Sequence, residues 1–303
     1  MSIFFAILLS AQLQFTYYFY AAKQAIEQQQ YGRALMTFRF CEQLNPTDGT
    51  TKEYLGLIHD ALGNEEEARG YFAKAYALNP YDLWKQYSLF LIRTGEDIDR
   101  RKALQILRRA GAEHPKDEDA WEMLYKADML LGEHKKALKD QDHLDSLRGY
   151  DVYSAYGRYE IYRAMNKPKL ALKEVERYLS LEPRDLNFQI LRVQLYERLG
   201  VKWSKLEEGY RTVLAMDPGN ILMLNNYAYG ITLYGGDLKQ AERMSQQTVR
   251  EEPDNPIYLD TYAWILHLQG QDTLAAIYIK RAMENIGDLD DQEIRKHYKK
   301  IVR

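Results

Sequence analysis

The chain has 303 residues, of which 46% are hydrophobic and 28% charged, and its formal net charge is −3. Nucleic-acid-binding proteins usually carry a basic excess, so this charge does not favour that class. Cys41 is the single cysteine, which excludes an intramolecular disulfide and any zinc site built from several cysteines.

A short apolar stretch, residues 3–9, opens the chain and leads into Leu9-Ser10-Ala11, a small-residue sequence of the kind that signal peptidases cleave. No lysine or arginine precedes the stretch, which argues against a signal peptide. We interpret residues 1–14 as a signal peptide or a hydrophobic lead-in to the first helix. An exported, periplasmic or cell-envelope location is expected, with the cytoplasm as the alternative. No run reaches the roughly 18 apolar residues of a membrane-spanning helix.

Prolines recur along the chain at intervals of 34 or 35 residues, with one double interval of 68: Pro46, Pro80, Pro115, Pro183, Pro218 and Pro253. Glycine fills the two missing steps, at Gly149 and Gly287. Both residue types end helices readily. A unit of about 34 residues therefore repeats through most of the chain.

Two further series share this period. Twelve residues before these positions stands alanine in seven of eight copies, with leucine in the other: Ala34, Ala68, Ala103, Ala137, Ala171, Leu206, Ala241 and Ala275. Residues that tolerate a left-handed backbone come before those: Gly63, Gly95, Gly132, Asn166, Gly200, Gly235 and Gly270. The pattern predicts two antiparallel helices per repeat, closely packed at the alanine and joined at the glycine. We find no period-two strand pattern, so an all-α fold is expected.

The segment Tyr54-Leu55-Gly56, followed by Ala68, Phe72, Ala75 and Pro80, resembles the tetratricopeptide repeat, and Trp121 to Leu124 opens another copy. The resemblance covers residues 15–288. It implies a right-handed superhelical solenoid of about eight repeats, and the last third is similar to exported bacterial scaffold proteins of this family. Residues 289–303 carry Ile294, Tyr298 and Ile301 at helical spacing and are expected to form a C-terminal capping helix.

Some copies depart from the pattern. Residues 96–102 are expected to lengthen the inter-helix loop of the third repeat. Gln141 and Ser245 replace a large residue, so their repeats are expected to pack less tightly. Arg158 and Arg192 stand where leucine is usual.

The sequence lacks the motifs of enzymes that we searched for: the HExxH zinc motif, phosphate-binding glycine loops and the GxSxG nucleophile motif. No catalysis, metal or cofactor is therefore predicted. The acidic group around His143, formed by Asp140, Asp142 and Asp145, is interpreted as a solvated face. The basic stretch 100–109 is also interpreted as surface, and Cys41 as a buried packing residue.

In the family, the first helix of each repeat lines a concave groove that binds a partner. Carried over by position, the resemblance implies these groove residues: Tyr153, Tyr156, Glu160 and Arg163 in the fifth repeat, Leu222, Asn225 and Tyr229 in the seventh, and Ile257, Asp260, Trp264 and His267 in the eighth. The tyrosines from 150 to 162 advance by three, so some of them are expected to pack between repeats. Phe19, Lys23 and Tyr54 occupy the positions of a chaperone-tail clamp without matching it, so a chaperone-tail adaptor is not favoured.

The resulting hypothesis is a non-catalytic scaffold or adaptor that binds a protein or peptide segment in this groove. Two alternatives stay open: an RNA-binding helical-repeat protein, and a non-catalytic accessory subunit of a cell-envelope enzyme complex.

Overall fold

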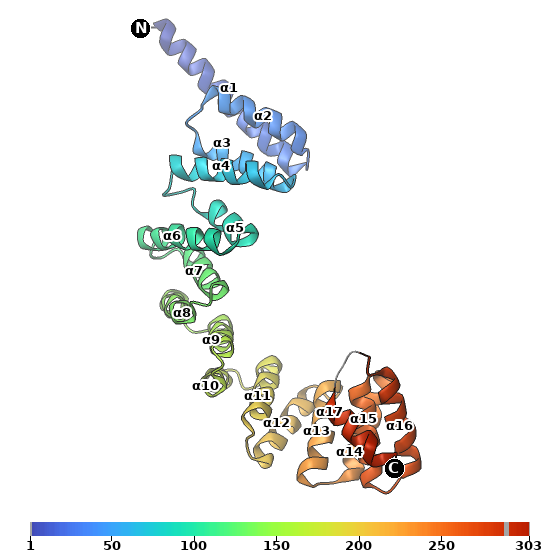
Figure 1. Cartoon of the computed structure of the whole chain (residues 1–303). Helices are drawn as coiled ribbons and strands as arrows, with labels where there is room; N and C mark the ends of the chain where they lie inside the picture. The colour runs from blue at the N-terminus through green and yellow to red at the C-terminus, as the bar shows by residue number, and fades with distance from the viewer. Residues whose placement is uncertain (1, 288–290, 303) are drawn as a thin grey trace. The chain divides into compact units, whose positions relative to one another are not determined.

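The computed structural model describes the backbone of residues 2–287 and 291–302, and side chains in those ranges from residue 11 onward. The described residues form seventeen α-helices and no β-strand (Figure 1). The predicted all-α class is therefore correct for this part of the chain.

The chain divides into two compact units at Met165 and Asn166. The first contains α1 (Ser2–Glu27), α2 (Tyr31–Leu44), α3 (Gly49–Ala61), α4 (Glu65–Leu78), α5 (Lys85–Thr94), α6 (Asp97–Glu113), α7 (Glu118–Leu130), α8 (His134–Arg148) and α9 (Val152–Ala164). The second contains α10 (Pro168–Leu179), α11 (Leu186–Leu199), α12 (Trp203–Met216), α13 (Ile221–Tyr234), α14 (Leu238–Glu251), α15 (Pro256–Leu268), α16 (Asp272–Asn285) and α17 (Gln292–Ile301).

Consecutive helices pair within each unit as the repeat pattern predicts. The pairs are α1 with α2, α3 with α4, α5 with α6 and α7 with α8 in the first unit, and α11 with α12, α13 with α14 and α15 with α16 in the second. The boundary between the units falls inside the predicted fifth repeat, so α9 and α10 belong to different units.

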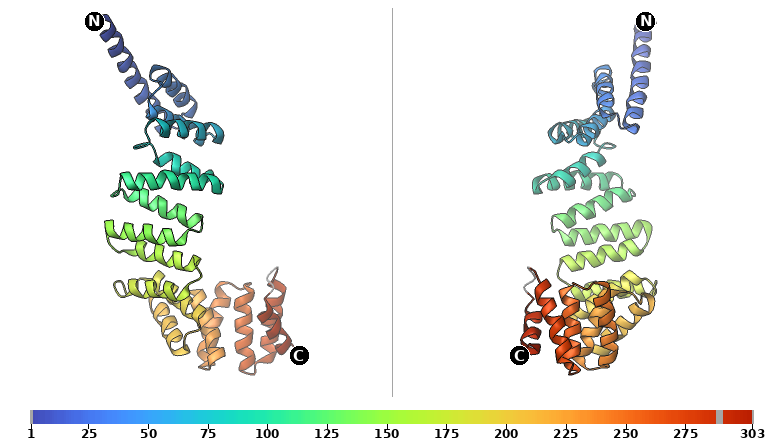
Figure 2. Two further views of the ribbon diagram at one scale, coloured as in Figure 1. Left: turned by 60° about the vertical axis from the view of Figure 1, so that its left-hand side comes forward. Right: turned by 90° about the vertical axis from the view of Figure 1, so that its right-hand side faces the viewer.

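Helices α1 and α17 cover the segments predicted to flank the repeats. Residues 2–14, expected as a signal peptide or lead-in, belong to the same helix as the start of the first repeat. Helix α17 falls within the predicted capping segment and packs against α15 and α16 (Figure 2). Residues 288–290 and 303 lie outside the described residues.

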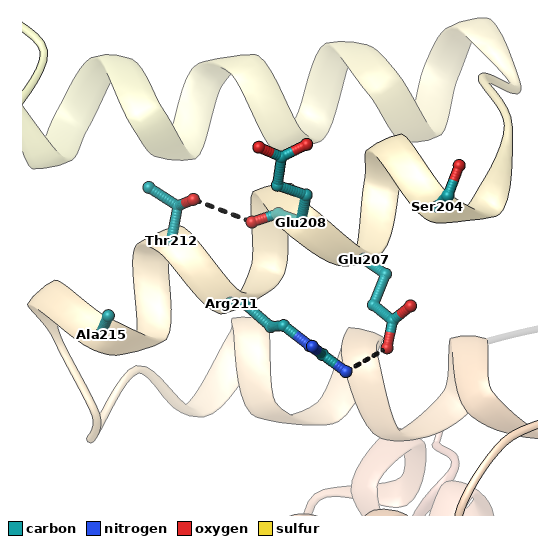
Figure 3. A pocket seen from close by; sticks show the side chains of 6 residues that line it. All are labelled: Ser204, Glu207, Glu208, Arg211, Thr212 and Ala215. Carbon is teal, nitrogen blue, oxygen red and sulfur yellow. Dashed lines mark hydrogen bonds and ion pairs between the residues drawn. The ribbon is translucent and has the colours of Figure 1, made fainter.

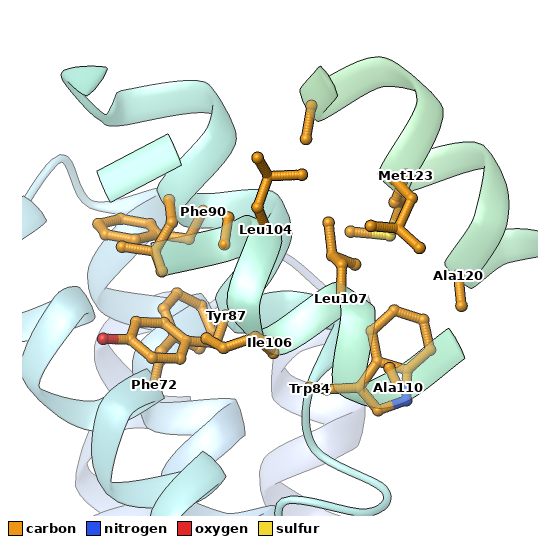
Figure 4. Packing of buried hydrophobic residues seen from close by; sticks show 14 of the residues in the cluster. Phe72, Trp84, Tyr87, Phe90, Leu104, Ile106, Leu107, Ala110, Ala120 and Met123 are labelled. Carbon is orange, nitrogen blue, oxygen red and sulfur yellow. The ribbon is translucent and has the colours of Figure 1, made fainter. Parts of the chain in front are cut away.

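The alanine series marks the tightest packing in both units. All seven alanines are 0% exposed, and Leu206 is 7% exposed. Between them, large side chains fill the space, as in the cluster of Phe72, Tyr87, Phe90 and Leu107 in the first unit (Figure 4). The small residue lets two helices approach, and the aromatic and aliphatic side chains then exclude water.

The third repeat departs from the prediction at Gly95. The other residues of the glycine series have a positive φ, but Gly95 is extended, with φ −87° and ψ 149°. Residues 97–102 do not lengthen the loop, because they form the first turns of α6, where Asp97 and Asp99 complement the helix dipole. The chain turns so sharply that a Cβ at Gly95 would lie 2.2 Å from the Leu91 carbonyl oxygen.

Asparagine and aspartate caps begin the first helix of most repeats. Side-chain oxygens accept backbone N–H groups at the start of α3, α7, α9, α11, α13 and α15, from Asp48, Asp117, Asp151, Asp185, Asn220 and Asn255. Each cap lies two residues after a proline or glycine of the terminating series. Each terminating residue and the cap of the next helix thus lie within three residues, and the cap satisfies backbone N–H groups at the start of that helix.

Candidate functional site

In the first unit, α9 carries the predicted aromatic surface. Tyr153 is 70% exposed and Tyr156 is 51% exposed, whereas Tyr159, on another side of the helix, is buried. Glu160 and Arg163 pair with each other, with 2.6 Å between the Glu160 Oε2 and Arg163 Nη2 atoms. The two exposed tyrosines therefore offer aromatic surface beside an ion pair that neutralises itself.

In the second unit, the predicted surface residues differ in exposure. Leu222 on α13 and Ile257 on α15 are each 45% exposed, but Asn225 is only 4% exposed. Its neighbour Asn226 is half-buried and reaches across to α11, donating from Nδ2 to Glu197 Oε1 at 3.0 Å. A one-residue shift rotates a side chain by about 100° around a helix, which explains why Asn226, and not Asn225, reaches the surface.

Helix α17 covers another part of the predicted groove. Asp260 is 5% exposed, and both its oxygens lie within 3.0 Å of His297 Nδ1 on α17. The Trp264 indole stacks on the His297 ring, with 4.1 Å between the ring centroids, and Tyr229 donates its hydroxyl to Glu293 of α17. Asp260 is therefore not open to a partner, because the chain's own last helix already occupies its hydrogen bonds.

Other groups complete this contact. Lys300 lies 4.9 Å from the Trp264 ring centroid, and His267 pairs with Asp272 at 2.6 Å. Burial, and then the neighbouring Glu293 carboxylate, raises the pKa of Tyr229, so its hydroxyl keeps the proton that it donates. Two of the predicted groove residues of the eighth repeat, Asp260 and Trp264, thus contact the capping helix, whereas His267 pairs with α16.

We expect His297→Ala to loosen α17. The change leaves the Asp260 carboxylate buried without its imidazole partner and removes the ring stacked on Trp264, at a cost of about 2 kcal/mol. Hydrogen exchange of residues 292–301 is then expected to accelerate at least about tenfold, since 1.4 kcal/mol corresponds to a factor of ten. The exposed change Lys299→Ala in the same helix serves as control. Unchanged exchange in His297→Ala would show that the Asp260–His297 pair does not hold α17.

The acidic group around His143, predicted as a solvated face, is exposed only in part, at Asp142. Asp142 and Asp145 both pair with Arg158, at 2.5 and 2.7 Å, and Asp140 is 8% exposed. The His143 ring stacks on Trp121. These ion pairs explain why arginine stands at position 158, where leucine is usual in the repeat: its guanidinium binds two carboxylates of the preceding helix.

Metal and thiol chemistry find no support in the described residues, where no group of three or more His, Cys, Asp or Glu side chains could hold a metal ion. Cys41 is buried, and burial raises the pKa of its thiol to about 11, which keeps it unreactive near neutral pH. In the basic stretch, Arg108 approaches the buried Asp128 and Arg109 pairs with Glu113. These two arginines therefore form ion pairs within the fold.

A hollow of about 370 Å³ lies along α12, but its polar groups bind one another (Figure 3). Arg211 pairs with Glu207 at 2.7 Å, and the Thr212 hydroxyl donates to the Glu208 carbonyl oxygen. All the lining residues come from one helix, so nothing converges there on a ligand.

These features define a helical-repeat protein with exposed aromatic side chains on first helices of its repeats, as at Tyr153 and Tyr156 on α9. A tetratricopeptide-repeat family model matches residues 21–82. A TPR repeat-containing protein of Pseudomonas aeruginosa is 29% identical over 122 residues, which cover 39% of this chain and 20% of that protein.

Solved structures agree on the fold. The C-terminal part of a TPR repeat-containing protein from Cytophaga hutchinsonii matches with a TM-score of 0.65 at 16% identity, covering 80% of this chain and 98% of that one. A tetratricopeptide-repeat protein from Parabacteroides merdae matches with a TM-score of 0.52 at 14% identity, covering 96% of this chain and 100% of that one. Residues 21–82 thus match the tetratricopeptide-repeat family, and the described chain shares the fold of these tetratricopeptide-repeat proteins. In its described part, no helix combines the length and apolar character needed to cross a membrane.

Proposed function

We propose that the protein is a scaffold or adaptor that binds an extended segment of another protein along the first helices of its repeats, without catalysis. The observation that carries this proposal is the exposure of Tyr153 and Tyr156 on α9. Exposed aromatic side chains on a rigid helix are typical anchors, because they bury a large area on binding and lose little conformational freedom.

The close packing of α9 against α8 supports this proposal. Gly157 on α9 lies so close to α8 that a Cβ there would be 2.5 Å from Gln141 Oε1. Arg158, one residue further on, ties α9 to α8 through Asp142 and Asp145. A surface that is ordered before the partner arrives limits the entropy lost on association.

Site-specific photo-crosslinking in the native cell tests the proposal. A photoreactive phenylalanine replaces Tyr156 in one variant and the exposed Lys139, on the second helix α8, in the matched control. We expect discrete adducts with a protein from position 156 and none from position 139. Equal adducts from both positions would contradict the assignment of the interface to the first helices. Adducts with RNA alone, together with binding that weakens steeply as salt rises, would favour the nucleic-acid alternative.

A further inference from the structure

A pocket of about 310 Å³ lies between α11, α12 and α13 in the second unit. Its polar floor is formed by Glu197, Tyr210 and Asn226, and its rim by Tyr229, Leu233 and Tyr234. Glu197 and Asn226 come from the first helices of consecutive repeats. The pocket therefore opens on the helices that the proposed function assigns to partner binding.

Glu197 brings a negative charge that its neighbours leave unpaired. Its Oε1 atom accepts hydrogen bonds from the Tyr210 hydroxyl and from Asn226 Nδ2, both neutral donors. Among the residues that the structure describes, no basic side chain forms an ion pair with Glu197, and none donates to Oε2. Burial, followed by the Glu197 carboxylate, raises the pKa of Tyr210, so the phenol stays protonated and cannot share the charge.

The surroundings of the pocket carry no competing cation on the first helices α13 and α15, whose sequences contain neither lysine nor arginine. Three basic groups of neighbouring elements are engaged elsewhere. Arg198 donates to Asn166, Lys205 pairs with Glu176, and Lys300 lies over Trp264. Carboxylates of Glu293, Asp260 and Asp291 also act on Tyr229, each raising its pKa after burial itself.

The walls of the pocket are flat aromatic rings. Tyr234 stacks on Trp203, with 5.0 Å between the centroids and 15° between the planes, and this stack fixes the orientation of its ring. Trp203 in turn packs against Gly230, where a Cβ would lie 2.5 Å from the indole. A fixed aromatic wall beside an ionised carboxylate is suited to a planar cation, since a guanidinium stacks on the ring while its N–H groups reach the oxygen.

We propose that this pocket binds one arginine side chain of the partner segment, with the guanidinium hydrogen-bonded to Glu197 Oε2 and stacked against the tyrosine wall. The inference rests on the proposed function for the source of the arginine. It adds the chemistry of the partner, a segment that carries a basic residue, which complements the Glu197 carboxylate.

Peptide binding to the full chain tests the pocket directly. The probe is acetyl-Gly-Arg-Gly-amide, and its neutral analogue contains citrulline, which keeps the shape and removes the charge. Binding is followed through the NMR signals of ring-labelled tyrosines. We expect the arginine peptide to shift the signals of Tyr229 and Tyr234, and the citrulline peptide to bind at least about tenfold more weakly.

Glu197→Gln is expected to weaken the arginine peptide at least about tenfold, because it removes the charge but keeps the acceptor oxygen. Glu208→Gln, at an exposed carboxylate on α12, is the matched control and should bind as the wild type does. Tyr234→Leu removes the aromatic wall without touching the charge and should also weaken binding. Thermal melts of all three variants report their folding.

Equal binding of the arginine and citrulline peptides, or undiminished binding by folded Glu197→Gln, would overturn the proposal. Equal binding of a lysine peptide would overturn the choice of a planar guanidinium. The test separates the two proposals: peptide binding without protein adducts at position 156 would refute only the first-unit surface. Adducts at 156 with no effect of Glu197→Gln would refute only the arginine pocket.

Discussion

Replacing Ala137 by arginine is expected to unfold the helix pair α7–α8 and to lower the free energy of unfolding of the first unit by about 4 kcal/mol or more. Ala137 is 0% exposed at the crossing of two helices. An arginine there has no room, and its charge has no partner prepared for it, so the helices must separate. In a repeat array the damage also removes the interface with each neighbouring pair.

Urea unfolding followed by circular dichroism measures this loss, and hydrogen exchange locates it. Exchange should rise first in α7 and α8, while the second unit keeps its protection. Lys139→Arg, two residues further along the same helix and exposed, is the control for a longer basic side chain. A wild-type unfolding curve for Ala137→Arg would refute the placement of this residue at the helix crossing.

The periodic residues of the sequence correctly predicted the helix pairs, because each marks a steric requirement that only a few side chains meet. Alanine lies at every close crossing except that of Leu206, and a positive φ follows the first helix at Gly63, Gly132 and Asn166. A fourth series was also present in the sequence: six asparagine and aspartate caps lie two residues after a proline or glycine of the terminating series. It marks where these first helices begin, for example α13 at Asn220.

The errors at the site have a different origin, because they depend on contacts between segments far apart in the sequence. Asp260 and His297 are separated by 37 residues. No local sequence pattern indicates that the His297 imidazole would contact the Asp260 carboxylate. The pocket at Glu197 also escaped prediction. Glu197 and Asn226 are 29 residues apart in the sequence and lie on different helices. Residue spacing does not show that the packed side chains leave a pocket between these helices.

A buried carboxyl pair in the first unit should make its stability depend on pH. Asp128 on α7 is 1% exposed and Asp140 on α8 is 8% exposed. Burial, and then the Asp128 carboxylate, raises the pKa of Asp140 to about 7, although Arg108 and Lys136 oppose the shift. Burial raises the pKa of Asp128 as well, and Glu133 adds to that shift. One proton shared by two carboxyl groups explains why both remain buried between α7 and α8.

The sign of the effect follows from linkage. An unfolded aspartate loses its proton near pH 4, whereas folded Asp140 keeps it until about pH 7. The folded state therefore binds more protons between these values, and the free energy of unfolding falls as pH rises from about 4 to 7, then levels off. We expect Asp140→Asn, whose amide can donate to Asp128 as the protonated acid does, to be more stable than the wild type by about 2–4 kcal/mol above pH 7.

Near pH 4 the two proteins should differ little, because the native Asp140 is then protonated and already resembles the amide. Urea unfolding at pH 4.5, 6 and 8 measures the difference, with the exposed Glu118→Gln on α7 as the control for loss of one carboxylate. Parallel pH profiles of the wild type and Asp140→Asn would show that Asp140 is ionised in the folded state. The Asp128–Asp140 pair would then need a second cation besides Arg108, whose guanidinium lies 3.4 Å from Asp128 alone.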